Sequence, residues 1–263
     1  MDLGLKNKRA LVTGASRGLG YVTAKLLAAE GCEVAINSRG IEKISAAAQK
    51  MSAETGGKVI GLAGDVGEAA VAEKLVRDAV EALGSLDILI CNAGGPPPGL
   101  FESFDEATWQ KAIDLSFMSN VRLIKAALPF LRQSDAASVL TITSYSVKQP
   151  IANLVLSNSI RAATVGLTKS LALELGKDGI RFNSILPAWT ETERVTELMT
   201  ARAKANGTTI EEELAKQSKE SPLGRMARPE EFGNAAVFLV SPAASYITGV
   251  MLSVDGGMYK GTL

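Results

Sequence analysis

Two side chains near the start of a long apolar helix are spaced so that they could act together. Ser157 and Arg161 are four residues apart in LSNSIRAATVGLTKSLALELG, residues 156–176, a stretch with the pattern of one helix. Residues i and i+4 lie on the same helical face, so we expect both side chains to point to one place. A hydroxyl can hydrogen-bond a substrate oxygen, and a guanidinium can bind ligand hydroxyls while it stays protonated.

The chain contains no histidine. This absence excludes Ser-His-Asp triads, Cys-His pairs and histidine zinc ligands, and we predict no metal site. The two cysteines, Cys32 and Cys91, stand at the edges of apolar runs without a CxxC spacing, which predicts buried free thiols. Any acid or base must therefore be Tyr, Lys, Asp, Glu, Cys or a water molecule.

A glycine-rich turn follows the first β-branched run. The sequence TGASRGLG, residues 13–20, lies between an apolar strand pattern and a helical pattern that ends at Gly31. Glycines in this setting allow a tight turn and let backbone N–H groups at a helix N-terminus approach a pyrophosphate. The strand before the turn and the helix after it favour a dinucleotide site over an ordinary turn.

Two arginines favour NADP over NAD as the dinucleotide. The second predicted strand ends in NSRG, residues 37–40, where an Asp or Glu would usually bind the ribose 2′-hydroxyl. Arg39 lies near that position and Arg17 lies in the glycine turn, and two guanidiniums can bind a 2′-phosphate. The alternative is that Arg39 is an ordinary surface residue.

The elements that must position these residues alternate along the chain. Helix-length segments separate seven short β-branched runs, which predicts a parallel sheet covered on both faces. No repeat, linker or composition shift divides the chain, so we predict one domain over residues 1–263. The charged segment 190–221 follows a strand and is a candidate substrate lid, with a plain solvated helical excursion as the alternative. The predicted strands cover residues 9–13, 33–37, 58–63, 86–91, 138–143, 180–186 and 250–254.

The bulk composition favours a small-molecule partner. Lys plus Arg and Asp plus Glu are equal at 28 each, so no net field attracts nucleic acid or an anionic membrane. No apolar run is long enough to span a bilayer, and the N-terminal residues lack the apolar region of a signal peptide. We therefore expect a cytoplasmic protein that binds neither nucleic acid nor membrane.

Six motifs, in order and with the expected spacing, resemble the short-chain dehydrogenase/reductase family, and most closely its 3-oxoacyl-[acyl-carrier-protein] reductase-like members. They are TGASRGLG, GDV at 64–66, LDILICNAG at 86–94, TITS ending at Ser144, RFNSILP at 181–187 and SYITGVMLSVDGG at 245–257. The resemblance implies a single doubly wound α/β domain of the Rossmann type. Its seven-stranded parallel sheet would carry helices on both faces.

The resemblance also implies a set of cofactor-binding residues. The glycine turn would line the phosphates, with the end of the second strand at the 2′ position. Two further turns would flank the adenine and pass under the ribose, and PAWTET at 187–192 would touch the nicotinamide end, although Ala188 stands where the family has glycine. The implied residues are Gly14, Ser16, Arg17, Gly18, Leu19, Ser38, Arg39, Asp65, Val66, Asn92, Ala93, Gly94, Arg161, Pro187, Thr190 and Thr192.

The catalytic residues depart from the family pattern of Asn, Ser, Tyr and Lys. Ser144 matches the family serine, but Ser157 occupies the tyrosine position, Arg161 the lysine position and Ser116 the asparagine position. An aliphatic hydroxyl is far less acidic than a phenol with its pKa near 10. Ser157 could orient a substrate oxygen but not act as the main proton donor, and Arg161 cannot relay a proton.

Nearby side chains could supply the proton instead. SYSVKQP, residues 144–150, contains Tyr145 and Lys148 in the segment that borders the substrate in this family. We expect one of them to be the donor, oriented with Ser144 and made more acidic by the field of Arg161. The alternatives are a Tyr145 ring packed beneath the lid and a Lys148 that is simply exposed.

The sequence thus predicts an NADP(H)-dependent oxidoreductase that interconverts a ketone, such as a 3-oxoacyl thioester, and a secondary alcohol. The alternatives are a cofactor-binding pseudoenzyme or redox sensor without turnover, and a structural subunit. The segment FLVSPAASYITGVMLSV, residues 238–254, resembles the family's tetramer interface. We therefore expect a homo-oligomer, a tetramer or a dimer.

Overall fold

The computed structural model describes residues 1–262, and Leu263 of the predicted domain lies outside the described residues. One seven-stranded sheet in the order β3-β2-β1-β4-β5-β6-β7 forms its centre, and every neighbouring pair is parallel. The predicted doubly wound fold is confirmed, and each predicted strand is present within two residues at either end. The strands are β1 (Arg9–Val12), β2 (Glu33–Ser38), β3 (Val59–Ala63), β4 (Ile88–Cys91), β5 (Ser138–Ile142), β6 (Arg181–Pro187) and β7 (Met251–Val254).

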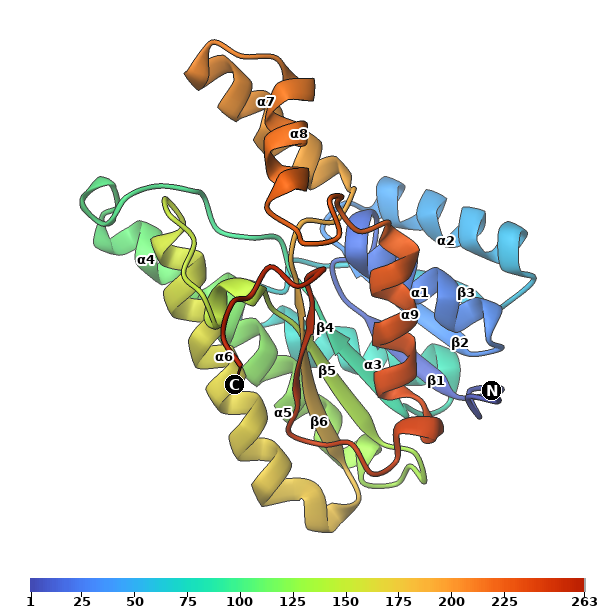
Figure 1. Cartoon of the computed structure of the whole chain (residues 1–263). Helices are drawn as coiled ribbons and strands as arrows, with labels where there is room; N and C mark the ends of the chain where they lie inside the picture. The colour runs from blue at the N-terminus through green and yellow to red at the C-terminus, as the bar shows by residue number, and fades with distance from the viewer. Residues whose placement is uncertain (263) are drawn as a thin grey trace.

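Helices cover both faces of the sheet (Figure 1). The central strands β4 and β5 are buried along their whole length, as strands sandwiched between two helical layers must be. The predicted helix at 156–176 is α6, one residue earlier at each end. The helices are α1 (Gly18–Ala29), α2 (Ile41–Thr55), α3 (Val71–Leu83), α4 (Glu106–Ile113), α5 (Ser119–Leu131), α6 (Val155–Leu175), α7 (Glu193–Asn206), α8 (Ile210–Lys219) and α9 (Pro229–Val240).

An apolar core lies between the sheet and the helices on each of its two faces. On one face α1, α2 and α9 pack on the sheet through residues such as Leu27, Ile44 and Phe232. On the other face α3, α5 and α6 do so through residues such as Leu75 and Leu123. The strand order reverses between β1 and β4, and in such sheets ligands bind beside the carboxyl ends of the strands at the reversal. The fold thus predicts where the site lies.

The helices α7 and α8 project from the carboxyl end of the sheet as an antiparallel pair (Figure 1). We call this pair, with its connections over residues 190–221, the α7–α8 hairpin. Thr209 begins α8 with a capping box to Glu212, in which each side chain bonds the backbone of the other residue. Met199 and Val195 belong to a small apolar cluster that joins the hairpin to the body. The hairpin therefore has stabilising contacts of its own, and this cluster attaches its base to the body of the domain.

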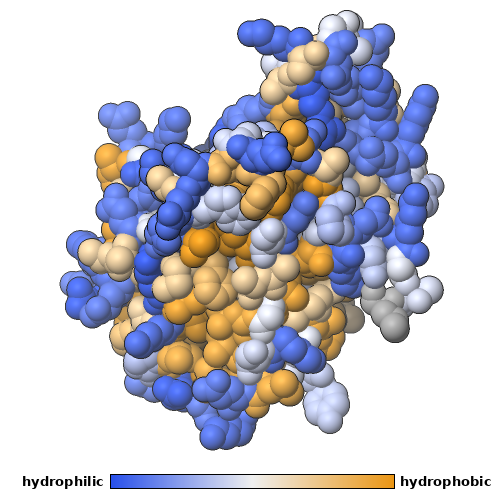
Figure 2. All heavy atoms as spheres, turned by 90° about the vertical axis from the view of Figure 1, so that its left-hand side faces the viewer, coloured by the Kyte–Doolittle hydropathy of each residue, from blue (hydrophilic) through white to orange (hydrophobic). Residues whose placement is uncertain are grey.

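A broad apolar area lies on the side of the molecule where α4 and α6 are found (Figure 2). Leu173 of α6 is 77% exposed, and Leu100 and Phe101 are also largely exposed. Within the described chain, no helix has the length and apolarity needed to cross a membrane.

Candidate active site

The glycine turn between β1 and α1 makes the floor of the site. Gly14 and Gly18 both have positive φ, +59° and +63°, a region that other residues seldom adopt. A Cβ on Gly14 would lie 2.8 Å from the Asn92 carbonyl oxygen, and one on Gly20 would lie 2.6 Å from the Gly14 carbonyl oxygen. The turn therefore needs glycine for both conformation and space. Ser16 lies within it, and Leu19 packs against the first core.

Reciprocal hydrogen bonds join the ends of β1 and β4 beneath this turn. The Thr13 hydroxyl donates to the Asn92 carbonyl oxygen at 2.7 Å and accepts from the Asn92 backbone N–H at 2.9 Å. The Asn92 side-chain amide donates to the Gly14 carbonyl oxygen at 3.0 Å. Asn92 is thus fixed at three atoms. Two residues on, a Cβ on Gly94 would have no atom within 4 Å in the described part of the chain, apart from its neighbours in sequence.

The end of β2 presents polar groups without partners. The Ser38 hydroxyl is buried and has no hydrogen-bond partner within the described residues. Arg39, the next residue, is exposed. In the turn after β3, the Gly67 N–H donates to the Asp65 carboxylate at 2.9 Å, and Val66 is buried in the second core. The predicted 2′ position thus contains one exposed cation and one buried hydroxyl.

The side chain of Arg17 forms an ion pair with a residue of the hairpin. Its Nη1 lies 2.7 Å from Oε1 of Glu197, on α7, and this ion pair connects the glycine turn to the α7–α8 hairpin. The pairing lowers the pKa of Glu197. Sequence reasoning did not single out Glu197, because the two residues are far apart in the chain and only the fold brings them together.

Arg161 is clamped at the carboxyl end of β5. Its Nη1 donates to the carbonyl oxygens of Ile142 at 3.0 Å and Thr143 at 2.9 Å, and its Nε donates to the Ser157 hydroxyl at 3.2 Å. Burial, with a smaller contribution from Arg194, lowers the pKa of the guanidinium to about 10. The predicted pairing of Ser157 with Arg161 on one helical face is therefore present in the structure.

The remaining guanidinium nitrogen of Arg161 points toward the glycine-rich loop that follows β4. A Cβ on Gly95 would lie 3.8 Å from Nη2. That loop is itself joined to the segment before α6, because the Gly99 N–H donates to the Asn153 carbonyl oxygen at 2.7 Å. Arg161 thus lies between the end of β5 and one wall of the site.

Ser144 begins the turn after β5 and lies next to the Thr143 carbonyl that Arg161 binds. Its hydroxyl accepts from the Ser146 backbone N–H at 3.1 Å. Arg161 therefore links the hydroxyl of Ser157 on α6 to the backbone directly before Ser144. Both serine hydroxyls keep a proton that no intramolecular acceptor takes in these hydrogen bonds, so each can donate to a substrate oxygen.

Ser116 lies in a π-helical turn, Asp114–Met118, between α4 and α5. Such turns are often found at functional sites. Its carbonyl oxygen accepts from the Asn120 amide at 2.8 Å and from the Thr164 hydroxyl at 3.0 Å, while its own buried hydroxyl has no partner among residues 1–262. Since two donors already occupy this carbonyl oxygen, a water relay through it has no free lone pair.

Tyr145 is buried, and burial raises its pKa, as does the charge of Glu220. This direction is opposite to our expectation that the field of Arg161 would make the phenol more acidic. The arginine that lowers this pKa is Arg202 of α7, and its effect is smaller than that of burial. The Trp189 indole also lowers the pKa by interacting with the phenol, but its buried N–H does not meet the geometry of a full hydrogen bond.

Lys148 lies at the end of the same turn, partly buried, with its Nζ 5.2 Å from the centre of the Tyr259 ring. This cation–π contact ties the turn after β5 to the C-terminal segment. The alternative that Lys148 is simply an exposed lysine does not describe it.

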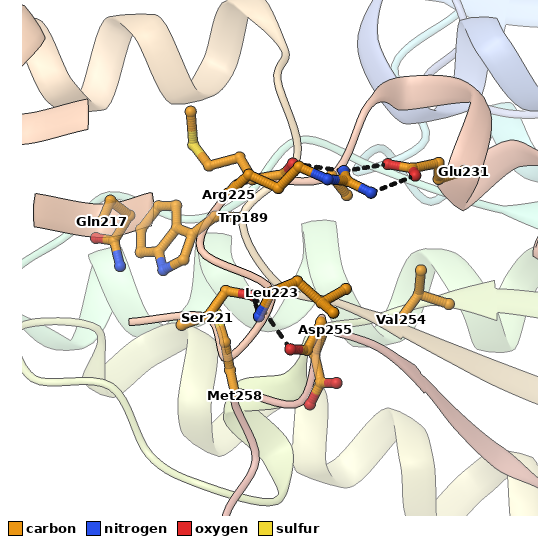
Figure 3. Close-up of a pocket in the computed structure, with 12 residues that line it drawn as sticks. Trp189, Gln217, Ser221, Leu223, Arg225, Glu231, Val254, Asp255 and Met258 are labelled. Carbon is orange, nitrogen blue, oxygen red and sulfur yellow. Dashed lines mark hydrogen bonds and ion pairs between the residues drawn. The ribbon is translucent and has the colours of Figure 1, made fainter. Parts of the chain in front are cut away.

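A cavity of about 150 Å³ opens beside Trp189 at the root of the hairpin (Figure 3). Arg225 spans its upper edge in a two-pronged ion pair with Glu231, at 2.7 Å for each prong. The Ser221 hydroxyl donates to the Gly256 carbonyl oxygen on the opposite side. The position of Trp189 after β6, within PAWTET, is the signal that could have identified this residue from the sequence.

The segment after β6 extends from Pro187 to the hairpin. The Ala188 N–H donates to the Val254 carbonyl oxygen at 3.1 Å, so alanine is accommodated in this turn. The buried hydroxyl of Thr190 has no partner within the described residues. Thr192 lies next to the glycine turn, since a Cβ on Gly18 would lie 4.0 Å from its methyl group.

These features fit a dinucleotide. The positive-φ glycines leave the N-terminus of α1 open to a pyrophosphate, as does the absence of a side-chain cap on that helix. The unpartnered buried hydroxyls of Ser38 and Thr190 lie at the two places where the ribose phosphate and the nicotinamide were predicted. Both cysteines are free and buried, and burial raises the pKa of each thiol to about 12, so they add no reactive thiolate.

Known proteins resemble this chain over nearly its whole length. The family description "Enoyl-(Acyl carrier protein) reductase" matches residues 14–259. The 3-oxoacyl-[acyl-carrier-protein] reductase FabG of Chlamydia trachomatis is 33% identical over 254 residues, which cover 97% of this chain and 98% of that protein. D-beta-hydroxybutyrate dehydrogenase of Cupriavidus necator is 33% identical over 256 residues, which cover 96% of this chain and 98% of that protein.

A solved structure of L-sorbose reductase from Gluconobacter frateurii, complexed with NADPH and L-sorbose, has the same fold. It is 31% identical, with a TM-score of 0.95, and the match covers 99% of this chain and 100% of that one. The strand order, the glycine turn and the similar proteins all indicate the same family. The chain therefore belongs to the short-chain dehydrogenase/reductase family of nicotinamide-dependent oxidoreductases.

Proposed function

We propose that this enzyme uses NADP(H) to interconvert a ketone and a secondary alcohol. The observation that carries the proposal is the Arg161 clamp, which brings the Ser157 hydroxyl to the end of β5 beside Ser144. Both hydroxyls can donate to one carbonyl oxygen placed above the dinucleotide floor. The cofactor supplies or accepts the hydride when it is bound.

NADP is proposed over NAD because of the charges around the end of β2. Arg39 is exposed there, Ser38 has an unpartnered hydroxyl, and Arg17 lies in the adjoining glycine turn. A phosphate on the ribose would accept hydrogen bonds from all three, and charge-assisted bonds from guanidinium are stronger than neutral ones. The nicotinamide end would lie by Pro187, Thr190 and Thr192.

The hydrogen bonding of Ser157 suits a role in orientation. Its oxygen accepts from Arg161 Nε, so its own proton is directed elsewhere and can hydrogen-bond a substrate carbonyl. The positive charge of Arg161 stabilises negative charge that develops on that carbonyl. We propose that Tyr145 supplies the proton; burial raises the pKa of its phenol and makes it a weaker acid than a free tyrosine.

The substrate class follows from the relatives only at the level of a carbonyl compound. FabG is named for a 3-oxoacyl substrate and the Gluconobacter enzyme for L-sorbose. We therefore propose 3-oxoacyl thioesters and keto-sugars as the first substrates to test.

Titration with NADPH and NADH tests the cofactor proposal. We expect NADPH to bind more tightly than NADH, followed by NADPH oxidation with at least one compound from a panel of 3-oxoacyl thioesters, diketones, quinones and keto-sugars. If neither nucleotide binds, the proposed function is wrong.

A second candidate function is a nucleotide-binding protein or redox sensor without turnover. The same clamp favours it, because three of the N–H groups of Arg161 are committed to protein oxygens and Ser157 is not a phenol. NADPH binding without oxidation over the whole panel and a broad pH range would support this candidate.

We also propose that copies of the chain associate through apolar surface, as the sequence predicts for a tetramer or dimer. Figure 2 shows a broad apolar face on the side of the molecule where α6 lies. Leu173 of α6 is largely exposed, and the predicted segment 238–254 contains the fully exposed Tyr246. Sedimentation velocity would test this. The cytoplasmic location stays a prediction.

A further inference from the structure

We propose that Glu197 is a specificity-determining residue that competes with the 2′-phosphate of NADP for Arg17. The inference rests on the proposed function, since it takes Arg17 as a ligand of that phosphate. It assigns a role in cofactor choice to a residue of the α7–α8 hairpin.

The geometry of the ion pair carries the inference. Arg17 is the residue directly before α1, so its backbone belongs to the glycine turn and its side chain leaves the N-terminal end of that helix. Its Nη1 contacts Glu197 Oε1 at 2.7 Å, with the two side chains 57% and 48% exposed. The pair therefore connects the dinucleotide floor to the hairpin at a place that solvent, and an incoming phosphate, can reach.

The two arginines proposed for the 2′ position differ in whether a carboxylate already pairs with them. Arg39 is exposed and forms no ion pair within residues 1–262, so it is ready to bind a phosphate. Arg17 has its charge compensated by a carboxylate. A cofactor with a 2′-phosphate thus meets one available guanidinium and one that is masked.

Because Glu197 is negatively charged, it competes with the 2′-phosphate for Arg17 and does not help to bind it. A ribose phosphate carries about −1.5 to −2 charges at neutral pH. A carboxylate bound to the same guanidinium therefore repels the phosphate. Arg194 offers Glu197 another partner, at 3.8 Å on the same helix. Releasing Arg17 therefore does not leave the carboxylate without a cation, and exchange of partners is favoured when the phosphate arrives.

The consequence is asymmetric between the two cofactors. NADH has no group that requires Arg17, so it binds with the ion pair intact. NADPH must displace Glu197 to use Arg17 fully, and part of its advantage over NADH is lost. Because binding linkage is reciprocal, NADPH would in turn loosen the hairpin from the glycine turn.

The experiment measures dissociation constants of NADPH and NADH by fluorescence titration, at about 0.15 M salt, for wild type and four variants. They are Glu197→Gln, Arg17→Ala, the Arg17→Ala/Glu197→Gln double variant and the control Glu193→Gln. Glu193 lies one turn earlier on α7 and outside this pair. Exposed ion pairs are worth up to about 1 kcal/mol, so we expect Glu197→Gln to tighten NADPH about two- to fivefold and leave NADH unchanged.

The other variants decide the mechanism. Glu193→Gln should change neither constant by as much as Glu197→Gln changes that of NADPH. The double variant should bind NADPH like Arg17→Ala alone. The inference is overturned if Glu197→Gln weakens NADPH, leaves it unchanged, tightens NADH equally or still tightens NADPH without Arg17. Failure of wild type to bind either nucleotide would instead remove the proposed function.

Discussion

Replacement of Arg161 by methionine separates its two tasks, holding the end of β5 and binding cofactor. Methionine is long enough to fill much of the space but removes every donor. The carbonyl oxygens of Ile142 and Thr143 lose the Nη1 donor, the Ser157 hydroxyl loses Nε, and Nη2 no longer faces the loop at Gly95.

The expected change in stability is small because two contributions oppose each other. Each carbonyl left without a donor costs about 1–3 kcal/mol. Burial lowers the pKa of Arg161 from 12.5 to about 10, and at about 1.4 kcal/mol for each pH unit this is roughly 3 kcal/mol of unfavourable charge burial that methionine removes. The net loss of unfolding free energy is about 1 kcal/mol, or a fall in Tm of about 2–4 °C.

The expected change in cofactor binding is larger. A charged hydrogen bond from Nη2 to a ribose hydroxyl contributes about 1.5–3 kcal/mol, so the dissociation constant of NADPH should rise about 10- to 150-fold. Thermal unfolding by circular dichroism and NADPH titration are the assays, with Arg161→Lys as the control that keeps the cation. If NADPH binds the methionine variant as tightly as wild type, or if Tm falls by more than about 10 °C, the division of roles argued above is wrong.

Three further predictions test separate parts of the site. Tyr145→Phe should lower turnover about 10²- to 10⁴-fold, the usual contribution of a general acid, with NADPH affinity unchanged. If turnover and NADPH affinity fall by the same factor, Tyr145 has a packing role and is not the proton donor. Gly14→Ala should destabilise the fold by at least about 1–2 kcal/mol, given its positive φ and the nearby Asn92 carbonyl, while Gly94→Ala should be nearly neutral in the same melts. Thr208, Asn206 and Lys216 lower the pKa of Glu213 to about 2, so its stabilising effect on the hairpin is present above pH 4.5 and lost as pH falls toward 2. Hydrogen exchange over α7 and α8 should rise across that range in wild type, and an equal rise in Glu213→Gln would contradict the assignment.

The sheet was predictable because buried strands have a strong local signal. Runs such as residues 86–91 and 138–143 are rich in apolar or β-branched residues, and each contains a strand with its carboxyl end at the site. The glycine turn was predictable for a similar reason. Gly14 and Gly18 adopt positive φ, and glycine is the residue type that does so readily. Helical spacing likewise brought Ser157 and Arg161 together.

The partners of the site residues were not predictable. Nothing local to Arg161 indicates that it donates to two carbonyls at the carboxyl end of β5, 19 and 18 residues earlier, or that burial lowers its pKa. The raised pKa of Tyr145 likewise comes from burial and from the charge of Glu220, which the fold brings from a distant segment. Pairings between elements require three-dimensional coordinates, whereas spacing within one element does not.

The bonds between Thr13 and Asn92 have a thermodynamic consequence for cofactor binding. They tie β1, β4 and the carbonyl of Gly14 into one unit before any ligand arrives. A dinucleotide that settles on this unit orders little additional backbone, so little conformational entropy is lost on that side. Calorimetry of the adenosine half alone should therefore show a smaller entropic penalty than the intact cofactor, whose nicotinamide end must also order the segment that leads into α7.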